Sequence, residues 1–485
     1  MLKRLPLYPL LFALFPILSL TAYNIEQISL DVVPRPLLVS LLLGILLFGV
    51  ARLTLRDWHR AALAALTALF LFFIYGQVYN LLEDVTLGDA SIFRHRTLLP
   101  LFGVLFLVIL YFIMRLKQPG RFTQGFNLLA IFLLVYPLVG ISFNTFQQES
   151  AGRAVNASSN RVAARPGLPD VYYIILDAYG RADVLQDLAG YDNSEFLNAL
   201  RRRGFYVADC SQSNYAYTEF SLASSLNFDY LDKLDVSNSR DERVALLQHS
   251  AVRSFFEVNG YKIAAFPTGY PFSEWRDADM YLSFDQPVTS LTEFESLILN
   301  TTALRAFTDF QAPNTSNASK KDLRRLRVFS ALEKTKKLPG VDGNVFAFIH
   351  FVVPHFPYTF GPNGEATAYS GKGATQEQTA AAYAGQVQFI NKEILKMVDV
   401  LLEDSDVPPV IIIQGDHGPL PDLAEDGAQR MPILNAYYLP GMEVDKVLYP
   451  SITPVNSFRI VLNFYFGQDL PLLDDTSYFA PLEDR

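Results

Sequence analysis

The stretch VYYIILDAYGR at residues 171–181 decides the fold of the second half of this 485-residue chain. Its first six residues are β-branched, aromatic or leucine, which is typical of a short strand buried on both faces. Similar runs recur as VFAFIHFVV at 345–353 and VIIIQ at 410–414. Because strands and helices alternate, we expect an α/β domain with a mostly parallel sheet and helices on both faces. The expected helices include Ser194–Arg203, Arg243–Asn259 and Ala380–Leu402.

Polar side chains follow each of these three expected strands. Asp177 follows the first strand directly, and His355 follows the second within the sequence PHFPY. The third strand runs into the sequence GDHGP, which contains Asp416 and His417. Ligands of parallel sheets bind beyond the carboxyl ends of the strands, so we expect these side chains to line one crevice.

The residue types in GDHG indicate a metal. An adjacent carboxylate and imidazole can turn toward one cation, because the flanking glycines permit backbone angles that other residues avoid. Asp with His suits one divalent ion, Mn²⁺ or Zn²⁺ in the first place, with Mg²⁺ also possible. Purely structural interpretations stay open: a capping Asp177, a solvated turn at Asp416 and His417, and a packed loop His355. His350 lies inside its apolar run and fits a buried strand residue better.

A fourth segment, NYAYTEFSLASSL at Asn214–Leu226, indicates a phosphate site. Thr218 and the small residues after it predict the start of a helix, where backbone N–H groups and the helix dipole favour a phosphoryl group. The alternative is that Thr218 only caps this helix.

The first 150 residues are a different kind of sequence. They hold 11 Lys and Arg against 7 Asp and Glu, whereas the rest of the chain holds 29 against 42. Their uncharged runs are apolar all round, and a membrane span needs about 20 such residues. We therefore expect five spans, of which the second is marginal in length. The runs are Leu5–Ile25, Pro36–Ala51, Ala61–Leu82, Thr97–Met114 and Phe122–Gln148.

Positive charges predict how these spans are oriented. Lys3 and Arg4, the cluster 52–60 and the cluster 115–121 fall on alternate sides of the spans and mark the cytoplasmic face. We expect a transmembrane domain at 1–148 in a plasma or inner membrane, a polar linker at 149–169 and an extracytoplasmic domain at 170–485. The acidic outer domain argues against a nucleic-acid partner. The single cysteine excludes an intramolecular disulfide.

In this order, the Asp after the first strand, the Thr that opens a small-residue helix, H-x-P-Y and G-D-H-G resemble the alkaline phosphatase superfamily, in its sulfatase-like branch. The arrangement of a five-span membrane domain joined to an outer domain is similar to that of lipoteichoic acid synthases and lipid A phosphoethanolamine transferases. The resemblance implies an alkaline phosphatase or sulfatase-like fold for residues 170–485.

The resemblance also implies roles for individual residues. Asp177, Thr218, Asp416 and His417 would bind the metal, Thr218 would be the nucleophile, and His355 would contact the substrate phosphate. The chain departs from the soluble sulfatases, because neither Cys210 nor Thr218 opens a C/S-x-P-x-R sequence. Ala178 stands where a two-acid strand end would carry a second Asp, which favours one metal ion. The cysteines of many phosphoethanolamine transferases are absent as well.

We expect a membrane-anchored transferase that moves a phosphoryl head group from a membrane lipid to an acceptor hydroxyl of a glycan or lipid, through a covalent intermediate on Thr218. A phosphodiesterase, phosphatase or sulfatase-type hydrolase with the same site is the nearest alternative. A non-catalytic membrane receptor that retains the fold is another. A transporter is disfavoured, since the spans carry no charge in their interiors.

Overall fold

The computed structural model describes residues 5–479 except 26–29, 83–84, 88–89, 159–166, 235–239, 285–290, 312–314, 368, 370, 372 and 420–426. The chain forms two compact units. One comprises Met1–Ser158 and Gln286–Lys320, and the other comprises Ser159–Asp285 and Lys321–Arg485. Lys3 and Arg4, two of the charges that predict the orientation, lie outside the described residues.

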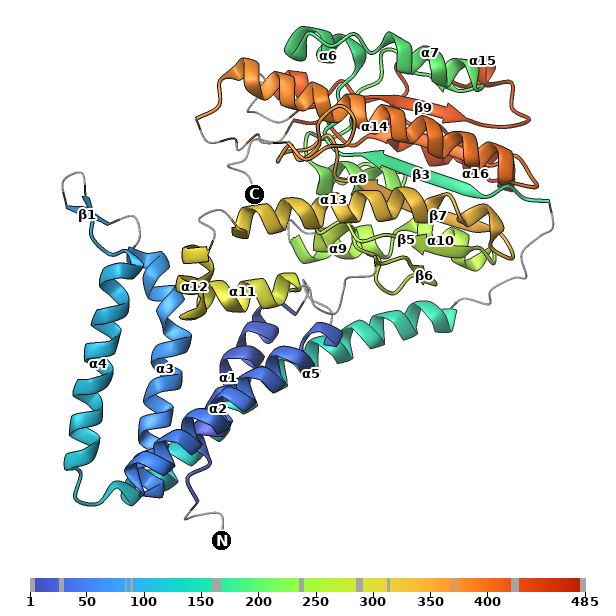
Figure 1. Ribbon diagram of the computed structural model, residues 1–485. Coiled ribbons are helices and arrows are strands. Elements are labelled where there is room, and N and C mark those ends of the chain that lie inside the picture. The colour runs from blue at the N-terminus through green and yellow to red at the C-terminus, as the bar shows by residue number, and fades with distance from the viewer. Residues whose placement is uncertain are drawn as a thin grey trace. The chain divides into compact units, whose positions relative to one another are not determined.

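The first unit contains apolar helices near the N-terminus, drawn in blue in Figure 1. Four segments of the described chain are long and apolar enough to span a membrane: Pro34–Leu55, Trp58–Leu82, His95–Arg115 and Pro119–Phe143. The expected first span is the helix α1 (Tyr8–Tyr23), which is apolar but has only 16 residues. The second expected span, Pro36–Ala51, is marginal in length. The helix that contains it, α2, is longer, with 22 residues. Four candidate spans are therefore present, and a fifth stays a prediction. The helices are α2 (Pro34–Leu55), α3 (Trp58–Leu82), α4 (His95–Arg115) and α5 (Thr123–Ser158).

Helix α5 continues to Ser158, ten residues into the segment expected to be a linker from Glu149. That segment is polar, but its alanines, arginines and glutamate are good helix formers. Its residues 159–166 lie outside the described part of the chain. The domain boundaries at 148 and 170 thus remain predictions.

The second unit contains a seven-stranded sheet with the strand order β4-β9-β8-β3-β7-β5-β6. The five neighbouring strands β8, β3, β7, β5 and β6 are mutually parallel, whereas β9 is antiparallel to both β8 and β4. The sheet is therefore mixed. The expected strands at 171, 345 and 410 are its three central members. The strands are β3 (Val171–Leu176), β4 (Tyr206–Val207), β5 (Lys262–Ala265), β6 (Met280–Tyr281), β7 (Val345–Phe351), β8 (Val410–Gly415) and β9 (Asn435–Tyr438).

Helices cover both faces of this sheet (Figure 1). Alternate residues of β3 belong to two separate cores: Tyr172 and Ile174 pack with α6, α7, α13 and α14, whereas Tyr173 and Ile175 pack with α8, α10 and α16. Every side chain of β3 is buried, as expected for a strand covered on both faces. The helices are α6 (Ala182–Ala189), α7 (Ser194–Arg202), α8 (Thr218–Leu226), α9 (Arg240–Gln248), α10 (Ala251–Val258), α13 (Thr315–Thr335), α14 (Gln376–Asp404) and α16 (Ser457–Phe466).

The helix expected at Arg243–Asn259 is divided into α9 and α10. The division falls at Ser250, whose side chain accepts a hydrogen bond from the Arg253 N–H at 3.3 Å and so caps α10. Helix α14 begins with a capping box formed by Thr375 and Gln378.

Two short helices between β6 and α13 belong to the first unit: α11 (Glu293–Thr301) and α12 (Leu304–Gln311). The sequence prediction placed these residues in the outer domain. Their contacts are with the apolar helices instead, since Phe294 is buried beside Ile17 and Val33.

Candidate active site

Three neighbouring strands end at one level, and polar residues follow there. In the register of the sheet, Leu176 of β3 lies opposite Phe351 of β7 and Gly415 of β8. Asp177 and Asp416 therefore emerge side by side, as expected at the carboxyl ends of parallel strands.

The loop after β3 turns sharply at Ala178, whose φ of +63° lies in the left-handed region that residues with a side chain rarely adopt. Its N–H donates to Oδ1 of Asp416 at 3.0 Å and so joins this loop to the one after β8. Gly415 allows the close approach, because a Cβ atom there would lie 2.5 Å from the carbonyl oxygen of Tyr179.

Asp177, Asp416 and His417 form a compact group, each no more than 2% exposed. One ligand atom of each lies within 4.8 Å of the other two. Nε2 of His417 lies 3.7 Å from Oδ1 of Asp177 and 3.6 Å from Oδ2 of Asp416. The structure thus brings together the three residues that the sequence singled out for a metal.

The hydrogen bonding of this group fits a cation. Oδ1 of Asp177 and Oδ2 of Asp416 are buried and lack a hydrogen-bond donor among the described residues. Nδ1 of His417 lies 2.7 Å from the carbonyl oxygen of Gly418, which can only accept, so the proton sits on Nδ1 and Nε2 presents a lone pair. Two unpaired carboxylate oxygens are costly to bury, and with an imidazole nitrogen they make a suitable donor set for a divalent ion.

Thr218 is the first residue of α8, and the capping position before it is occupied by Tyr217. Oγ1 of Thr218 lies 3.3 Å from Nε2 of His417, so the hydroxyl is close to the group of Asp177, Asp416 and His417. The simple capping interpretation of Thr218 is therefore wrong. The amino end of α8 adds partial positive charge at this point.

His350, which the sequence indicated as a buried strand residue, lies in β7 and is 4% exposed. It also touches the site: its Nε2 lies 3.3 Å from Oδ2 of Asp177, and its Nδ1 lies 3.0 Å from Oγ of Ser273. A histidine one residue before the end of a strand that carries the site was the signal that could have revealed this role.

His355 is half-buried, and its ring centre lies 6.3 Å from that of His417. Its Nδ1 contacts the carbonyl oxygen of Phe356. The loop is held by Arg324 of α13, which donates to the carbonyl oxygens of Val352 at 3.0 Å, Phe356 at 2.9 Å and His355 at 2.9 Å. Sequence reasoning missed Arg324, because nothing in a polar helix shows which of its cations is buried.

The charges of these groups shift each other's ionisation. Burial raises the pKa of Asp177, but the neighbouring imidazoles, that of His355 foremost, bring it below its ordinary value. Burial lowers the pKa of His355, Asp177 opposes this, and the Arg324 guanidinium adds to the lowering. The pKa values of both groups thus lie below their ordinary values.

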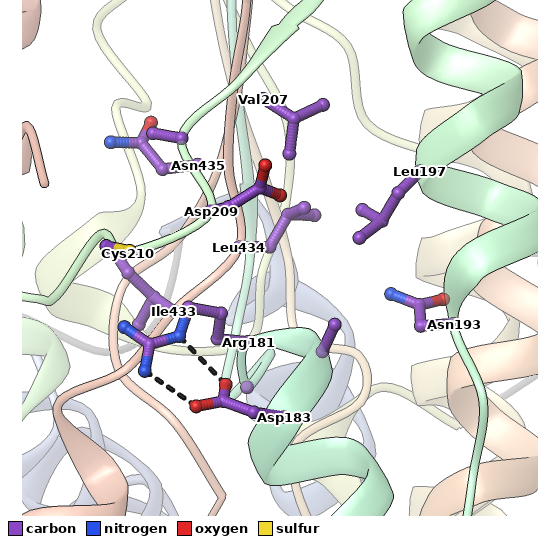
Figure 2. A pocket seen from close by; sticks show the side chains of 13 residues that line it. Arg181, Asp183, Asn193, Leu197, Val207, Asp209, Cys210, Ile433, Leu434 and Asn435 are labelled. Carbon is purple, nitrogen blue, oxygen red and sulfur yellow. Dashed lines mark hydrogen bonds and ion pairs between the residues drawn. The ribbon is translucent and has the colours of Figure 1, made fainter. Parts of the chain in front are cut away.

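A cavity of about 350 Å³ is lined by Arg181, Cys210 and Asn435 among other residues (Figure 2). Arg181 there donates to both carboxylate oxygens of Asp183, at 2.8 and 2.7 Å. Its described lining includes none of the five predicted site residues.

Comparisons with known proteins bear on this site. A family model described as Sulfatase matches residues 169–452, more than half of the chain. No curated protein matches. Similar solved structures include the soluble domain of lipooligosaccharide phosphoethanolamine transferase A from Neisseria meningitidis, which is 14% identical, with 63% of this chain and 90% of that chain covered and a TM-score of 0.41. The integral membrane form of that transferase is also 14% identical, with 95% and 94% covered and a TM-score of 0.39. A 2-O GAG sulfatase is 12% identical, with 65% and 73% covered and a TM-score of 0.41.

Proposed function

Because the chain belongs to the sulfatase family, we propose that it is a membrane-anchored, metal-dependent transferase that moves a phosphoryl head group from a membrane lipid to an acceptor hydroxyl through a covalent Thr218 intermediate. The observation that carries this proposal is the position of the Thr218 hydroxyl, 3.3 Å from the imidazole nitrogen of the buried Asp177, Asp416 and His417 group. The four candidate spans in the same chain favour a donor lipid in the membrane.

Asp177, Asp416 and His417 would hold one divalent ion, with Thr218 as the fourth protein ligand. Mn²⁺ or Zn²⁺ matches these donors best, and Mg²⁺ is possible. Such an ion favours the ionised form of a bound hydroxyl and offsets negative charge on phosphoryl oxygens.

The chain's own residues account for the rest of the chemistry. In the first step the Thr218 Oγ1–P bond forms as the bond from phosphorus to the lipid oxygen breaks, and the proton lost from Oγ1 of Thr218 ends on the departing lipid alcohol. In the second step an acceptor hydroxyl attacks the same phosphorus as the bond from Oγ1 of Thr218 to phosphorus breaks, and the proton of the acceptor passes by way of His355 to the released Thr218 oxygen. The amino end of α8 stabilises the charge of the phosphoryl group in both steps.

We propose that His355 contacts the substrate phosphate and accepts a proton during the reaction. Since Nδ1 faces the carbonyl oxygen of Phe356, the neutral ring presents Nε2 to accept a proton from an attacking hydroxyl. Arg324 fixes this loop through the backbone carbonyls and so holds the ring in place.

The test is a mass measurement of Thr218 after the full chain is incubated with membrane lipids labelled in the head group. We expect labelled Thr218 in the wild type, weaker labelling in Thr218→Ser, and none in Thr218→Ala. Thr375→Ala is the matched control, because it removes a genuine helix cap, worth about 0.5–2 kcal/mol, without touching the site. Equal labelling of wild type and Thr218→Ala would refute the covalent intermediate.

A further inference from the structure

Helices α11 and α12 interrupt the outer domain and pack on the apolar helices of the first unit. They pack on α3 at a contact that we call the seat. There the N–H of Ala303 donates to the carbonyl oxygen of Phe72 at 2.9 Å. Gly76 makes the close approach possible, because a Cβ atom there would lie 2.4 Å from the carbonyl oxygen of Asn300. A backbone hydrogen bond to a helix and a contact that admits no side chain indicate a built interface.

Further contacts fix both helices at this end of the apolar helices. Glu295 belongs to the capping box of α11 and forms an ion pair with Arg35 near the start of α2. The guanidinium of Arg305 lies 4.5 Å above the ring of Tyr79, near the end of α3.

The depth of the seat follows from the geometry of α3. This helix ends at Leu82, so Gly76 and Phe72 lie six and ten residues before its end. At 1.5 Å per residue these positions are roughly 9 and 15 Å below the end of the helix. A helix of 25 residues is about 38 Å long and exceeds the hydrocarbon core of about 30 Å by about 8 Å, or about 4 Å at each end. The seat therefore lies roughly 5–11 Å on the acyl side of the boundary between head groups and acyl chains.

Large apolar side chains of this pair of helices face outward. Phe294 and Ala306 are buried within the first unit, but four large apolar side chains of the two helices and of the residues just before α11 are exposed. These are Leu291 at 53%, Leu297 at 37%, Leu304 at 43% and Phe307 at 60% exposed.

We propose that α11 and α12 form an interfacial element whose exposed face, Leu291, Leu297, Leu304 and Phe307, is inserted among the lipids of the leaflet at this end of α3. The occupant is the membrane lipid itself, because the seat lies within the length of a span and short amphipathic helices reach about 5–10 Å into this boundary. The inference is independent of the reaction proposed above.

The experiment uses the full chain in lipid vesicles. Cys210, the only cysteine, is exposed and is first replaced by serine. Single cysteines are then placed by Leu297→Cys and Phe307→Cys and labelled with a polarity-sensitive fluorophore, and quenching by phospholipids brominated in their acyl chains is measured. Val407→Cys in the outer domain has the same 37% exposure as Leu297, and Leu107→Cys lies in the span α4. They are the negative and positive controls.

We expect quenching at Leu297 and Phe307 several times that at Val407, approaching that at Leu107, and unaffected by the protein-to-lipid ratio. Leu291→Cys and Leu304→Cys provide a second pair should either first variant fold poorly. Quenching no greater than at Val407 would overturn the proposal. Apolar emission that increases with the protein-to-lipid ratio, without bromine quenching, would assign the face to a second copy of the chain and overturn it equally.

Discussion

The hydroxyl oxygen of Thr218 lies 3.3 Å from Nε2 of His417, although 199 residues separate the two in the chain. The contact joins the start of α8 to the loop after β8. Because Nδ1 of His417 is engaged by the carbonyl oxygen of Gly418, the atom that faces Thr218 is a lone-pair donor suited to a metal. The proposed nucleophile and a proposed metal ligand thus meet at one point, and the following predictions rest on this geometry.

The first prediction concerns metal and stability together. Without metal, the unpaired oxygens of Asp177 and Asp416 destabilise the buried group, so metal-free Asp416→Asn should melt no lower than the metal-free wild type. With metal at about 100 times its Kd the wild type should gain about 2.7 kcal/mol, and Asp416→Asn or His417→Ala should gain little. Thermal unfolding of the full chain with and without a chelator measures this. Asp183→Ala is the control, and an unchanged metal response in His417→Ala would show that the loop is only a turn.

His350 should strengthen metal binding without itself being a metal ligand. Its contact with Oδ2 of Asp177 orients that carboxylate, and losing such a contact typically costs 10–100-fold in metal affinity. We expect His350→Ala to weaken metal binding by about this factor. His249→Ala removes a partly exposed histidine that lies 3.9 Å from Asp277, and it should leave the affinity unchanged. Competition against a fluorescent chelator gives both dissociation constants, and equal values would assign His350 to packing alone.

Arg324 should matter far more than a surface arginine. Arg324→Met leaves the carbonyl oxygens of Val352, His355 and Phe356 without this donor, at about 1–3 kcal/mol for a buried group left unpaired. Arg201→Met removes an exposed pair with Asp209, worth about 0–1 kcal/mol. Unfolding and turnover are measured together, and Arg324→Lys should recover part of each. Equal stability of the two methionine variants would contradict the inference that Arg324 holds the loop of His355 in place.

The pH dependence of stability can be tested at Asp277. Burial raises the pKa of this carboxyl, but its hydrogen bond and charge pairing with Arg253 bring it below the ordinary value of 3.8. A lowered pKa in the folded protein gives stability that is present above the ordinary pKa and lost as the pH falls through the folded one. Asp277→Asn should therefore melt below the wild type at pH 7, and the two should converge below pH 3.8. A difference that persists in acid would mean that the charge is not its source.

Sequence reasoning located the site because its residues follow strands that are themselves visible in the sequence. Three nearly continuous apolar runs mark the strands: VYYIIL, VFAFIHF and VIIIQG. The residue that follows such a run lies at the carboxyl end of a strand in the sheet. Asp177, Asp416 and His417 could be placed together on that basis alone. Strands β4 and β6 have only two residues each and carry no such pattern.

Two features depended on tertiary contacts that a sequence pattern does not encode. Nothing in the sequence of α11 or α12 shows that they pack on α3, because the decisive contacts are a backbone hydrogen bond to Phe72 and the missing side chain of Gly76. The continuation of α5 to Ser158 was hidden by polar composition, which predicts a linker although the same residues form helix well.

The last prediction separates a transferase from a hydrolase with the same residues. Both need Thr218, but they differ in what attacks the covalent intermediate. A transferase excludes water from that state, so the label should stay on Thr218 in buffer and leave it only when a hydroxyl-bearing glycan or lipid is added. Chasing labelled protein with buffer, with a glycan or with a lipid, and separating free from transferred head group, measures the three fates. His355→Asn should slow the acceptor-dependent loss more than the labelling, if His355 takes the proton of the acceptor. Rapid release of free head group in buffer would identify a hydrolase, and transfer unaffected by His355→Asn would remove that residue from the second step.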